Sequence, residues 1–406
     1  MANTFNFGSG KWAAKEGSVL AYNNENNNFK PLPFTFTRAS TATRVNESGL
    51  IESVASGVPR IDFLDNADGH LLLEPSRTNL FLRSEEFDNA SWIKNNSSIS
   101  ANSVVSPDGS TNADSLIENT ANASHNIYQS VSITSGTTYT ISFFVKANGR
   151  TRFRIGDNYG RLPLNVFFDL STVTVVSGTG SISDYGNGWY RCTVSSTATA
   201  TAAELLYIIL VNSGTTTTYT GDGTSGLYLW GAQLEAGSYA TSYIPTSGAA
   251  VTRAADFASQ TPPSGIIGQT EGTFFLDFSS LSDSISNEQV SLSDGTDANT
   301  IKFVLGSVVT GVQAEGRVSS VSQFSIKKTT SDYDSLKKIA VAYKANDFVF
   351  YYNGEQVGID SSGNIPSISQ IKFSTGAGTS PLYGKINGVQ LYNTRLSNSE
   401  LAALTS

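Results

Sequence analysis

The chain has 406 residues, enough for two or three domains that each bury a core of their own. Charged residues make up 15% of it, and 26 basic against 34 acidic residues give a formal net charge of −8. A diffuse acidic charge disfavours nucleic acids and anionic membranes as partners. One cysteine, Cys192, excludes an intrachain disulfide framework. The two histidines, His70 and His125, lack the neighbours of a zinc site or a Ser-His-Asp triad.

No segment of the sequence has the pattern of a secretion signal or a membrane span. The first residues, MANTFNFGSGKW, lack the charged start and apolar core of a signal peptide, so we expect no Sec export. The longest apolar run, Leu205–Val211, is far shorter than the roughly 20 residues that a membrane helix needs. The sequence therefore predicts a soluble protein.

Strand patterns dominate the chain. Short segments rich in β-branched and aromatic residues are separated by turn formers, as in β-sandwiches and barrels. Asn353-Gly354, between two apolar alternations, predicts a hairpin with a type I′ turn. The helix signal is a C-terminal capping box, Ser397-x-x-Glu400, followed by Leu401–Leu404. The sequence thus predicts an all-β protein with under a tenth of its residues helical. The clearest strand segments are PFTFTRAS, YTISFFVKA, TRFRIGD, LNVFFDL, ELLYIILV and GTFFLDF.

The strand runs divide the chain into two predicted β-sandwich domains behind an irregular N-terminal segment. Residues 1–90 show hairpins and extended pieces without a continuous run of strands. The two runs occupy residues 90–247 and 268–406. Residues 248–267 lack periodicity, so we expect a linker there.

The stretch LYLWGAQLEAGSYATSYIPT, Leu227–Thr246, closes the first run of strands. Strict alternation would divide its first half between two faces of the sheet. The polar tail that follows is expected to leave the sandwich and run to the next domain as an extended strap. The alternation places Tyr228, Trp230, Ala232 and Leu234 on one face, and Leu227, Leu229, Gly231 and Gln233 on the other.

The densest mixed cluster of polar and aromatic residues is RTRFRIGDNYGR, Arg150–Arg161. Arginines alternate on one side of a strand, and acidic, amide and aromatic residues follow in a loop. Planar hydrogen-bonding groups beside an aromatic ring suit sugar hydroxyls and C–H faces. The alternative is a solvated strand face, the commoner role of exposed arginine. The candidate glycan-binding residues are Arg152, Arg154, Asp157, Asn158 and Tyr159.

Two acidic loops are candidates for a calcium site. In DFLDNADGH, placing Gly69 at the sixth position of an EF-hand loop puts Leu64 at the first, so the pattern fails and a polar hairpin turn is favoured. In SDGTDANT, Asp294, Asp297 and Asn299 have oxygens suited to one calcium ion, with a turn as the alternative. The sequence indicates no other cofactor.

Several separated motifs resemble those of tailed-bacteriophage virion proteins. In that group a carbohydrate-binding-module-like jelly roll follows an N-terminal segment, which implies a jelly roll at residues 90–247. Residues 270–406 are similar to concanavalin/laminin-G-like sandwiches through KIAVAYKANDFVFYYNGEQVG and GKINGVQLYNTRLSNSELAAL. The phage-like motifs are Phe34–Phe63, Leu71–Trp92, Gly186–Ser195 and Gly221–Thr246.

The resemblance implies a non-enzymatic virion structural protein, a tail or head fibre whose lectin-like modules bind host-surface glycans as receptors. It transfers no catalytic residue. One alternative is a capsule polysaccharide depolymerase, for which 34 acidic residues offer many carboxylate pairs and no distinguished one. The other is a structural capsid decoration or connector protein. We expect the protein on the surface of the phage particle, assembled in the host cytoplasm with other virion proteins.

Two expectations about assembly follow from the resemblance. A homotrimer is expected, because linking weak sugar sites raises their joint affinity by about 10²–10⁴-fold and identical chains usually assemble with closed symmetry. Residues 1–35 are expected to dock on the particle or on another subunit. Phe5, Phe7 and Trp12 lie there among Gly, Ser and Asn, too few apolar residues for an independent core.

Overall fold

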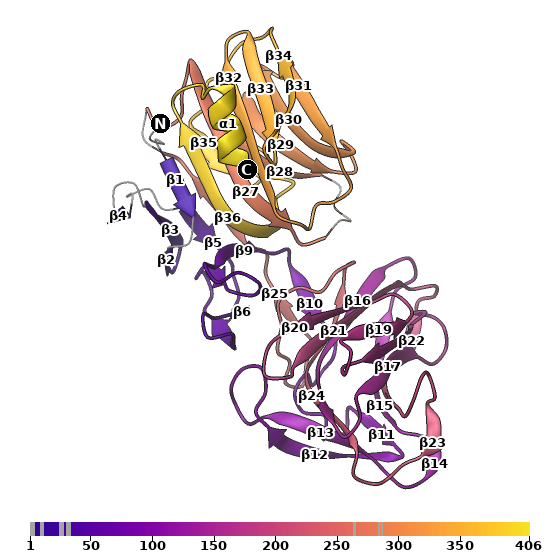
Figure 1. The fold of residues 1–406 in the computed structure, drawn as a ribbon. Helices are drawn as coiled ribbons and strands as arrows, with labels where there is room; N and C mark the ends of the chain where they lie inside the picture. Colours follow the sequence, from indigo (N-terminus) through magenta and orange to yellow (C-terminus); the bar gives the residue numbers. More distant parts are fainter. Residues whose placement is uncertain are drawn as a thin grey trace. The chain divides into compact units, whose positions relative to one another are not determined.

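The computed structural model describes residues 5–8, 12–23, 28–29, 34–262, 265–282, 285 and 287–406. Strands dominate these residues, and α1 (Asn398–Thr405) is the one helix among them (Figure 1). The all-β prediction is confirmed. None of the helical structure described is long and apolar enough for a membrane span.

Contacts between residues divide the chain into two compact units. Unit 1 comprises residues 1–41, 54–75 and 254–406, and unit 2 comprises residues 42–53 and 76–253. Most of unit 2 is therefore an insertion into the chain of unit 1. The insertion begins and ends in one antiparallel pair, β10 (Arg77–Asn79) with β25 (Val251–Arg253), in which Arg77 lies opposite Arg253. This pairing brings the two ends of the insertion together.

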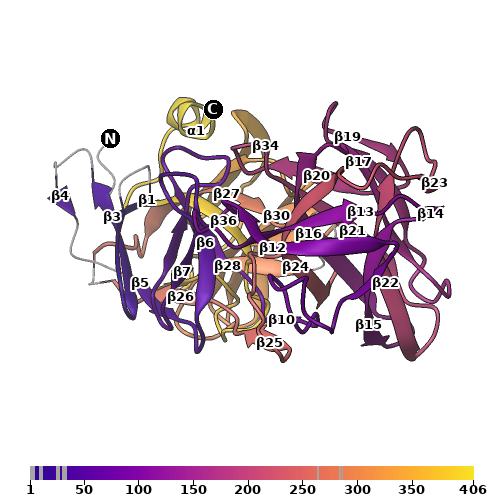
Figure 2. The ribbon, with the colours of Figure 1, turned by 90° about the horizontal axis from the view of Figure 1, so that it is seen from below.

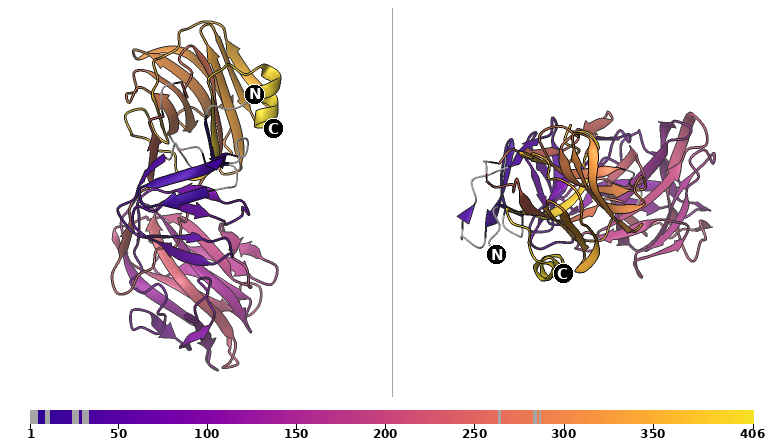
Figure 3. Two further views of the ribbon diagram at one scale, coloured as in Figure 1. Left: turned by 90° about the vertical axis from the view of Figure 1, so that its left-hand side faces the viewer. Right: turned by 90° about the horizontal axis from the view of Figure 1, so that it is seen from above.

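Unit 1 contains an eight-stranded and a ten-stranded sheet, which form two layers in Figure 3. Residues from both sheets enter one core. The eight-stranded sheet has the order β34 (Glu355–Asp360), β33 (Asp347–Tyr352), β32 (Lys337–Lys344), β27 (Glu271–Ser280), β36 (Gly384–Tyr392), β9 (His70–Leu73), β8 (Arg60–Asp62), with β1 (Phe5–Gly8) also on β36. The ten-stranded sheet has the order β2 (Trp12–Lys15), β3 (Ser18–Asn23), β5 (Phe34–Thr37), β26 (Phe257–Gln260), β35 (Gln370–Lys372), β28 (Glu288–Ser293), β29 (Thr300–Gly306), β30 (Gly311–Val318), β31 (Val321–Thr329), with β4 (Asn28–Phe29) on β3.

The side chains of β27 alternate between the core of this sandwich and the outer face of the eight-stranded sheet. Phe274, Leu276 and Phe278 enter the core between the two sheets, whereas Phe275 faces outward. On that outer side, α1 packs against β32, β33 and β34 and adds Leu401 to a smaller apolar cluster. A sheet face that would otherwise be apolar and exposed is thereby covered.

Two local predictions are confirmed in unit 1. Ser397 is the N-cap of α1, its hydroxyl accepting the backbone N–H of Glu400, and the Glu400 carboxylate accepts the backbone N–H of Ser397 at 2.8 Å. The hairpin between β33 and β34 turns at Asn353 and Gly354, with φ of 46° and 82°. Both residues have the positive φ that a type I′ turn requires.

The N-terminal residues build both sheets of unit 1 instead of forming a separate irregular segment. Phe7 in β1 is 1% exposed, and its ring centroid lies 4.3 Å from that of Phe34 and 5.5 Å from that of Trp12. Its own chain therefore covers the apolar surface that was expected to need a partner. The burial of Phe7 could not be predicted from the sequence, because β1 pairs with β36, about 380 positions later in the chain. The side chain of Phe5 lies outside the described residues.

Unit 2 is a sandwich of two six-stranded sheets with a common core. The β22 sheet has the order β11 (Ile93–Asn95), β15 (Asn126–Ile133), β22 (Ala202–Val211), β17 (Arg152–Asp157), β18 (Asn165–Asp169), β19 (Thr174–Ser177). The β24 sheet has the order β12 (Ser97–Val104), β13 (Ala113–Glu118), β24 (Gly226–Ala236), β16 (Thr138–Asn148), β21 (Tyr190–Thr197), β20 (Ser181–Asp184). Two short pairs complete the unit: β14 (Asn122–Ser124) with β23 (Thr218–Thr220), side by side in Figure 2, and β6 (Ala42–Val45) with β7 (Ile51–Val54).

The unit boundaries differ from the expected domain boundaries in two places. Residues 76–90 belong to unit 2, while most described residues before them belong to unit 1. Residues 248–267, the expected linker, contain β25 and β26, and β26 pairs with both β5 and β35. Strands of three or four residues that are buried on one side show too few alternations to be recognised in the sequence.

A β-bulge in β24 overturns the predicted division of its side chains between two faces. Gly231 has a φ of 61°, and the pairing with β16 shifts register at this point. Leu227 and Leu229 before the bulge, and Ala232 and Leu234 after it, therefore all enter the same core. The extra residue in the bulge switches the side chains after it to the opposite face of the sheet. A prediction based on strict alternation of side chains does not include such a switch.

The segment after β24 also differs from the expected strap between domains. Its residues fold back onto unit 2, where Tyr243 and Ile244 are 3% exposed. The Tyr243 ring centroid lies 4.5 Å from that of Trp230. Asn79 donates from Nδ2 to the carbonyls of Ala232 (2.9 Å) and Ile244 (2.8 Å). The tail is therefore part of the sandwich that it follows.

Candidate functional site

The predicted arginines lie on the outer face of the β22 sheet in unit 2. Phe153 and Ile155 of β17 enter the core, so Arg152 and Arg154 point to the opposite, outer side. The sequence prediction that these two arginines share one strand face matches this placement. The two side chains have different surroundings.

Arg152 is held by an ion pair within the sheet. Its Nε donates to Oδ2 of Asp169 at 2.7 Å, and Asp169 is 1% exposed. Burial raises the pKa of Asp169, but hydrogen bonds from Ser171 and Arg152 more than offset this, so the pKa lies below its usual value. Arg152 therefore stabilises a buried carboxylate, and its guanidinium is largely committed to that task.

The loop after β17 is anchored by a carboxylate that the sequence analysis did not single out. Glu204 is fully buried, and its Oε1 accepts the backbone N–H groups of Asn158 (3.3 Å) and Tyr159 (3.0 Å). Its Oε2 accepts the N–H of Arg161 at 3.0 Å. Oδ1 of Asp157 accepts the backbone N–H of Leu164 at 3.1 Å. Asp157 and Asn158 thus shape the loop, and Glu204 fixes its position against β22.

Tyr159 is the exposed aromatic ring of this loop, with 55% of its surface accessible. Cζ of Arg161 lies 4.5 Å from the ring centroid, so the guanidinium covers one side of the ring. Arg161 is itself held by a hydrogen bond from Nη1 to the carbonyl of Ala203, 2.7 Å long. The ring is therefore fixed at the edge of the sheet face.

Arg154 is the predicted residue whose guanidinium remains available. An ideal Cβ on Gly156 would lie 2.9 Å from Cζ, Nε and Nη2 of Arg154, so the missing side chain makes room for this guanidinium. Its Cζ lies 5.9 Å from the Phe167 ring centroid. Nε is buried without a hydrogen-bond partner in the described part of the chain. Burial lowers the pKa of Arg154, although Asp157 acts in the opposite direction.

Two tyrosines that the sequence analysis did not name lie beside Arg154. Tyr128 of β15 pairs with Tyr207 of β22, and Tyr207 pairs with Gly156 of β17. The two ring centroids are 4.6 Å apart with 36° between the planes, and both side chains are partly exposed. Burial raises the pKa of Tyr207, and the charges of neighbouring groups, of which Tyr128 has the largest effect, raise it further. Tyr128, Tyr207 and Arg154 together are called the tyrosine–arginine face below.

This face combines the groups that sugar recognition uses. Tyrosine rings bind the C–H side of a pyranose, and a guanidinium donates two parallel hydrogen bonds to hydroxyl pairs or to a carboxylate. Asn165, opposite Gly156 on β18, adds an exposed amide to the same row. Both tyrosines stand at outward positions of recognisable strands, so alternation alone would have found them. Their proximity to Arg154 depends on strand register, which the sequence does not reveal.

The second predicted site, Asp294–Asn299 in unit 1, is a closed polar turn. Oδ1 of Asp294 accepts from the N–H and the hydroxyl of Thr296, and Oδ2 accepts from Nδ2 of Asn299 at 2.8 Å. Oδ1 of Asp297 accepts the N–H of Ala377 at 3.1 Å. Among the residues that the structure describes, no three His, Cys, Asp or Glu side chains are placed to hold a metal ion. The oxygens proposed for calcium thus serve the turn.

No family model matches the sequence, and no curated protein matches it. Among solved structures, the chain is similar to Ruminococcus gnavus IT-sialidase CBM40 bound to alpha2,3 sialyllactose, with 16% identity, a TM-score of 0.30, and coverage of 34% of this chain and 84% of that one. It is also similar to a SAP-like pentraxin from Limulus polyphemus (12%, TM-score 0.27, coverage 34% and 70%). Domains LG4-5 of the mouse laminin alpha1 chain match at 12% identity, with a TM-score of 0.25 and coverage of 64% and 84%. Likeness at this level carries no argument about function.

Proposed function

We propose that the chain is a non-catalytic glycan-binding protein whose binding surface is the tyrosine–arginine face of unit 2. The observation that carries the proposal is the Arg154 guanidinium, for which the described chain supplies no hydrogen-bond partner, beside the Tyr128–Tyr207 pair. A sugar ring stacks on Tyr207 while Arg154 donates to adjacent hydroxyls or to a carboxylate. The rigid sheet holds these groups in place before the ligand arrives, which lowers the entropy cost of binding.

Two of the carboxylates near this face, Asp169 and Glu204, serve the structure and are unsuited to hydrolysis. Glycoside hydrolysis commonly needs two carboxyl groups, one of them kept protonated by a raised pKa. Asp169 has a lowered pKa and is paired with Arg152. Glu204 is buried beneath the loop, where backbone N–H groups engage both of its oxygens. Neither residue is suited to act as the proton donor of a depolymerase.

We further propose that the protein is a surface component of a tailed-bacteriophage particle, a tail or head fibre assembled in the host cytoplasm. The ordered phage-like motifs between residues 34 and 246 support this assignment. Its partners are then other virion proteins and host-surface glycans. A homotrimer fits the role, because several weak sugar sites on one particle bind with joint affinity. Immunogold labelling of virions tests the location, and light scattering tests the oligomeric state.

Binding to host-surface polysaccharide tests the glycan-binding proposal. Tyr207→Ala and Arg154→Ala should each weaken binding by about 10- to 100-fold, the effect of losing a contact worth about 1–3 kcal/mol. Tyr228→Ala, on a partly exposed tyrosine of the β24 sheet, is the matched control and should bind like the parent. Release of reducing ends is measured in the same samples. Parent-like binding by both variants refutes the site, and release of reducing ends refutes the non-catalytic assignment.

A further inference from the structure

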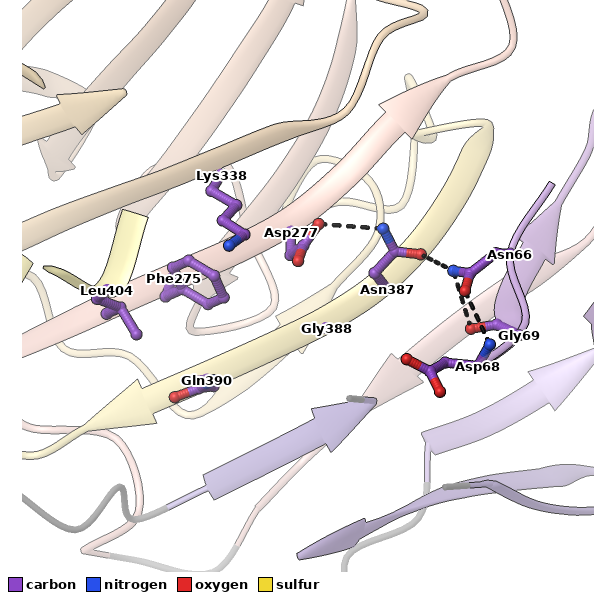
Figure 4. A pocket seen from close by; sticks show the side chains of 10 residues that line it. All are labelled: Asn66, Asp68, Gly69, Phe275, Asp277, Lys338, Asn387, Gly388, Gln390 and Leu404. Atoms are coloured by element: carbon purple, nitrogen blue, oxygen red, sulfur yellow. Dashed lines mark hydrogen bonds between the residues drawn. The ribbon is translucent and has the colours of Figure 1, made fainter. Parts of the chain in front are cut away.

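A pocket of about 410 Å³ opens on the outer side of the eight-stranded sheet in unit 1. Strands β27, β32 and β36 supply its floor, and the turn between β8 and β9 and the end of α1 border it. Its volume lies within the range of about 300–1,000 Å³ that is usual for small-molecule sites. Figure 4 shows the polar side chains Asn66, Asp277 and Asn387 in a row along one side of the pocket.

Hydrogen bonds fix this row of side chains. Nδ2 of Asn66 donates to Oδ1 of Asn387 at 3.1 Å, and Nδ2 of Asn387 donates to Oδ1 of Asp277 at 3.1 Å. Oδ1 of Asn66 accepts the backbone N–H of Asp68 at 2.9 Å, which sets the orientation of the first amide. Each amide then determines the orientation of the next group. The row ends at the Asp277 carboxylate, so that carboxylate is held in a single direction.

Asp277 presents an open acceptor to the pocket. Its Oδ2 makes no hydrogen bond to any residue that the structure describes, whereas Oδ1 is taken by Asn387. Burial raises the pKa of Asp277, although the hydrogen bond from Asn387 and the charge of Lys338 act in the opposite direction. Lys338 lies directly across the strand pair from Asp277 and extends toward it, and its Nζ donates one hydrogen bond to the backbone carbonyl of Ser406. An ammonium has three donors, so Lys338 keeps donors for a ligand that binds at Asp277.

Away from the amide row, two apolar side chains line the pocket beside Lys338 and Gln390. Phe275 from β27 and Leu404 from α1 line it, and Phe275 is 4% exposed. A ligand in this space meets mainly polar groups, with a smaller patch of hydrocarbon at Phe275 and Leu404. A sugar residue has the same division, with hydroxyls at its rim and C–H groups on its face.

The charges around the pocket select among classes of ligand. Asp68 and Asp277 carry two negative charges against one positive charge on Lys338, which disfavours an anion. The ammonium of Lys338 next to Asp277 disfavours a metal ion, which needs several oxygen ligands free of a competing cation. We propose that this pocket is a second binding site, for one neutral sugar residue or a similar polyol, and that it acts independently of the tyrosine–arginine face in unit 2.

Saturation-transfer NMR on the full chain tests the pocket with four separate probes: glucose, galactose, N-acetylglucosamine and rhamnose. At least one should receive saturation from the protein and titrate to a single site. Leu404→Trp fills the pocket from α1 and should abolish the transfer. Ala403→Trp, at the exposed neighbouring position of the same helix, is the matched control and should leave the transfer intact.

Asp277→Asn keeps the shape of the side chain and removes its charge. It should weaken binding of the same sugar about tenfold, as expected when a hydrogen bond to a charged acceptor becomes one to a neutral acceptor. Tyr207→Ala, in the face of unit 2, should leave the transfer unchanged, so failure of one site is distinguishable from failure of the other. Absence of transfer for all four sugars, or transfer that survives Leu404→Trp combined with Tyr207→Ala, overturns the proposal.

Discussion

Arg60 and Glu74 form a buried ion pair in unit 1, with Nη1 of Arg60 2.6 Å from Oε2 of Glu74. Nη2 of Arg60 contacts the carboxylate of Asp256, whose Oδ1 lies 3.2 Å from Nη1 of Arg38. Burial disfavours the charged form of Arg60, but Asp256 and Glu74 outweigh it, so the pKa of Arg60 lies above its usual value. Two arginines and two carboxylates therefore join segments that precede and follow the insertion of unit 2.

Asp256→Ala should destabilise unit 1 by about 3–5 kcal/mol, because it removes a buried carboxylate that contacts two buried guanidinium groups. Urea unfolding with separate probes for the two units measures this loss. The control is Glu52→Ala, which breaks the half-exposed pair of Glu52 with Arg44 in unit 2 and should cost less than about 1 kcal/mol. Equal losses in the two variants would show that the buried network adds no special stability.

The insertion of unit 2 leads to a prediction about folding. A chain in which a short Gly/Ser linker replaces residues 76–253 should still fold unit 1, because the β10–β25 pairing brings the ends of the insertion together. Circular dichroism should show strand, and heating should give one cooperative transition. Adding Asp256→Ala to this shortened chain should abolish the transition. A shortened chain without a transition would mean that unit 1 depends on unit 2 to fold.

The sequence predicted those features that depend on neighbouring residues. The capping box at Ser397, the turn at Asn353 and the outward direction of Arg154 all follow from local pattern and were found. Features that depend on long-range register were missed. Tyr207 meets Arg154 only through the pairing of β22 with β17, and Phe7 reaches the core only through the pairing of β1 with β36. Local propensity carries no information about such pairings.

Gly231→Ala should destabilise unit 2 for two reasons. The bulge in β24 requires a left-handed backbone at this position, and an ideal Cβ would lie 2.7 Å from Cδ2 of Phe144. We expect a loss of about 1–3 kcal/mol from both effects together. Gly136→Ala separates them, since Gly136 also has a positive φ, 78°, with no atom within 4 Å of the added Cβ. Its loss should be about 1 kcal/mol or less. Equal losses would mean that crowding against Phe144 contributes nothing.

Glu288 makes the stability of unit 1 depend on pH. Burial raises its pKa to about 8 from a usual value of 4.5, against an opposing hydrogen bond from Ser280. Between these two values the folded state keeps a proton that the unfolded state has released, so stability falls as pH rises toward about 8 and then levels off. Urea unfolding of unit 1 between pH 5 and pH 9 measures the slope, and Glu288→Gln should flatten it. The same slope in this variant would assign the dependence to another group.

Gly156→Ala should weaken glycan binding without unfolding the protein. The backbone at Gly156 lies outside the positive-φ region, so alanine fits the strand, but its Cβ would lie 2.9 Å from the guanidinium of Arg154. The flexible arginine side chain must move, and its donors then no longer stand beside Tyr207. Binding to host polysaccharide should fall about tenfold, and stability should change by less than about 1 kcal/mol. Ser130→Ala, at an exposed outward position of β15, is the control and should bind like the parent. The variant keeps every polar group of the face and changes only the position of the Arg154 guanidinium. Parent-like binding by Gly156→Ala would therefore show that the placement of Arg154 over Gly156 does not determine recognition.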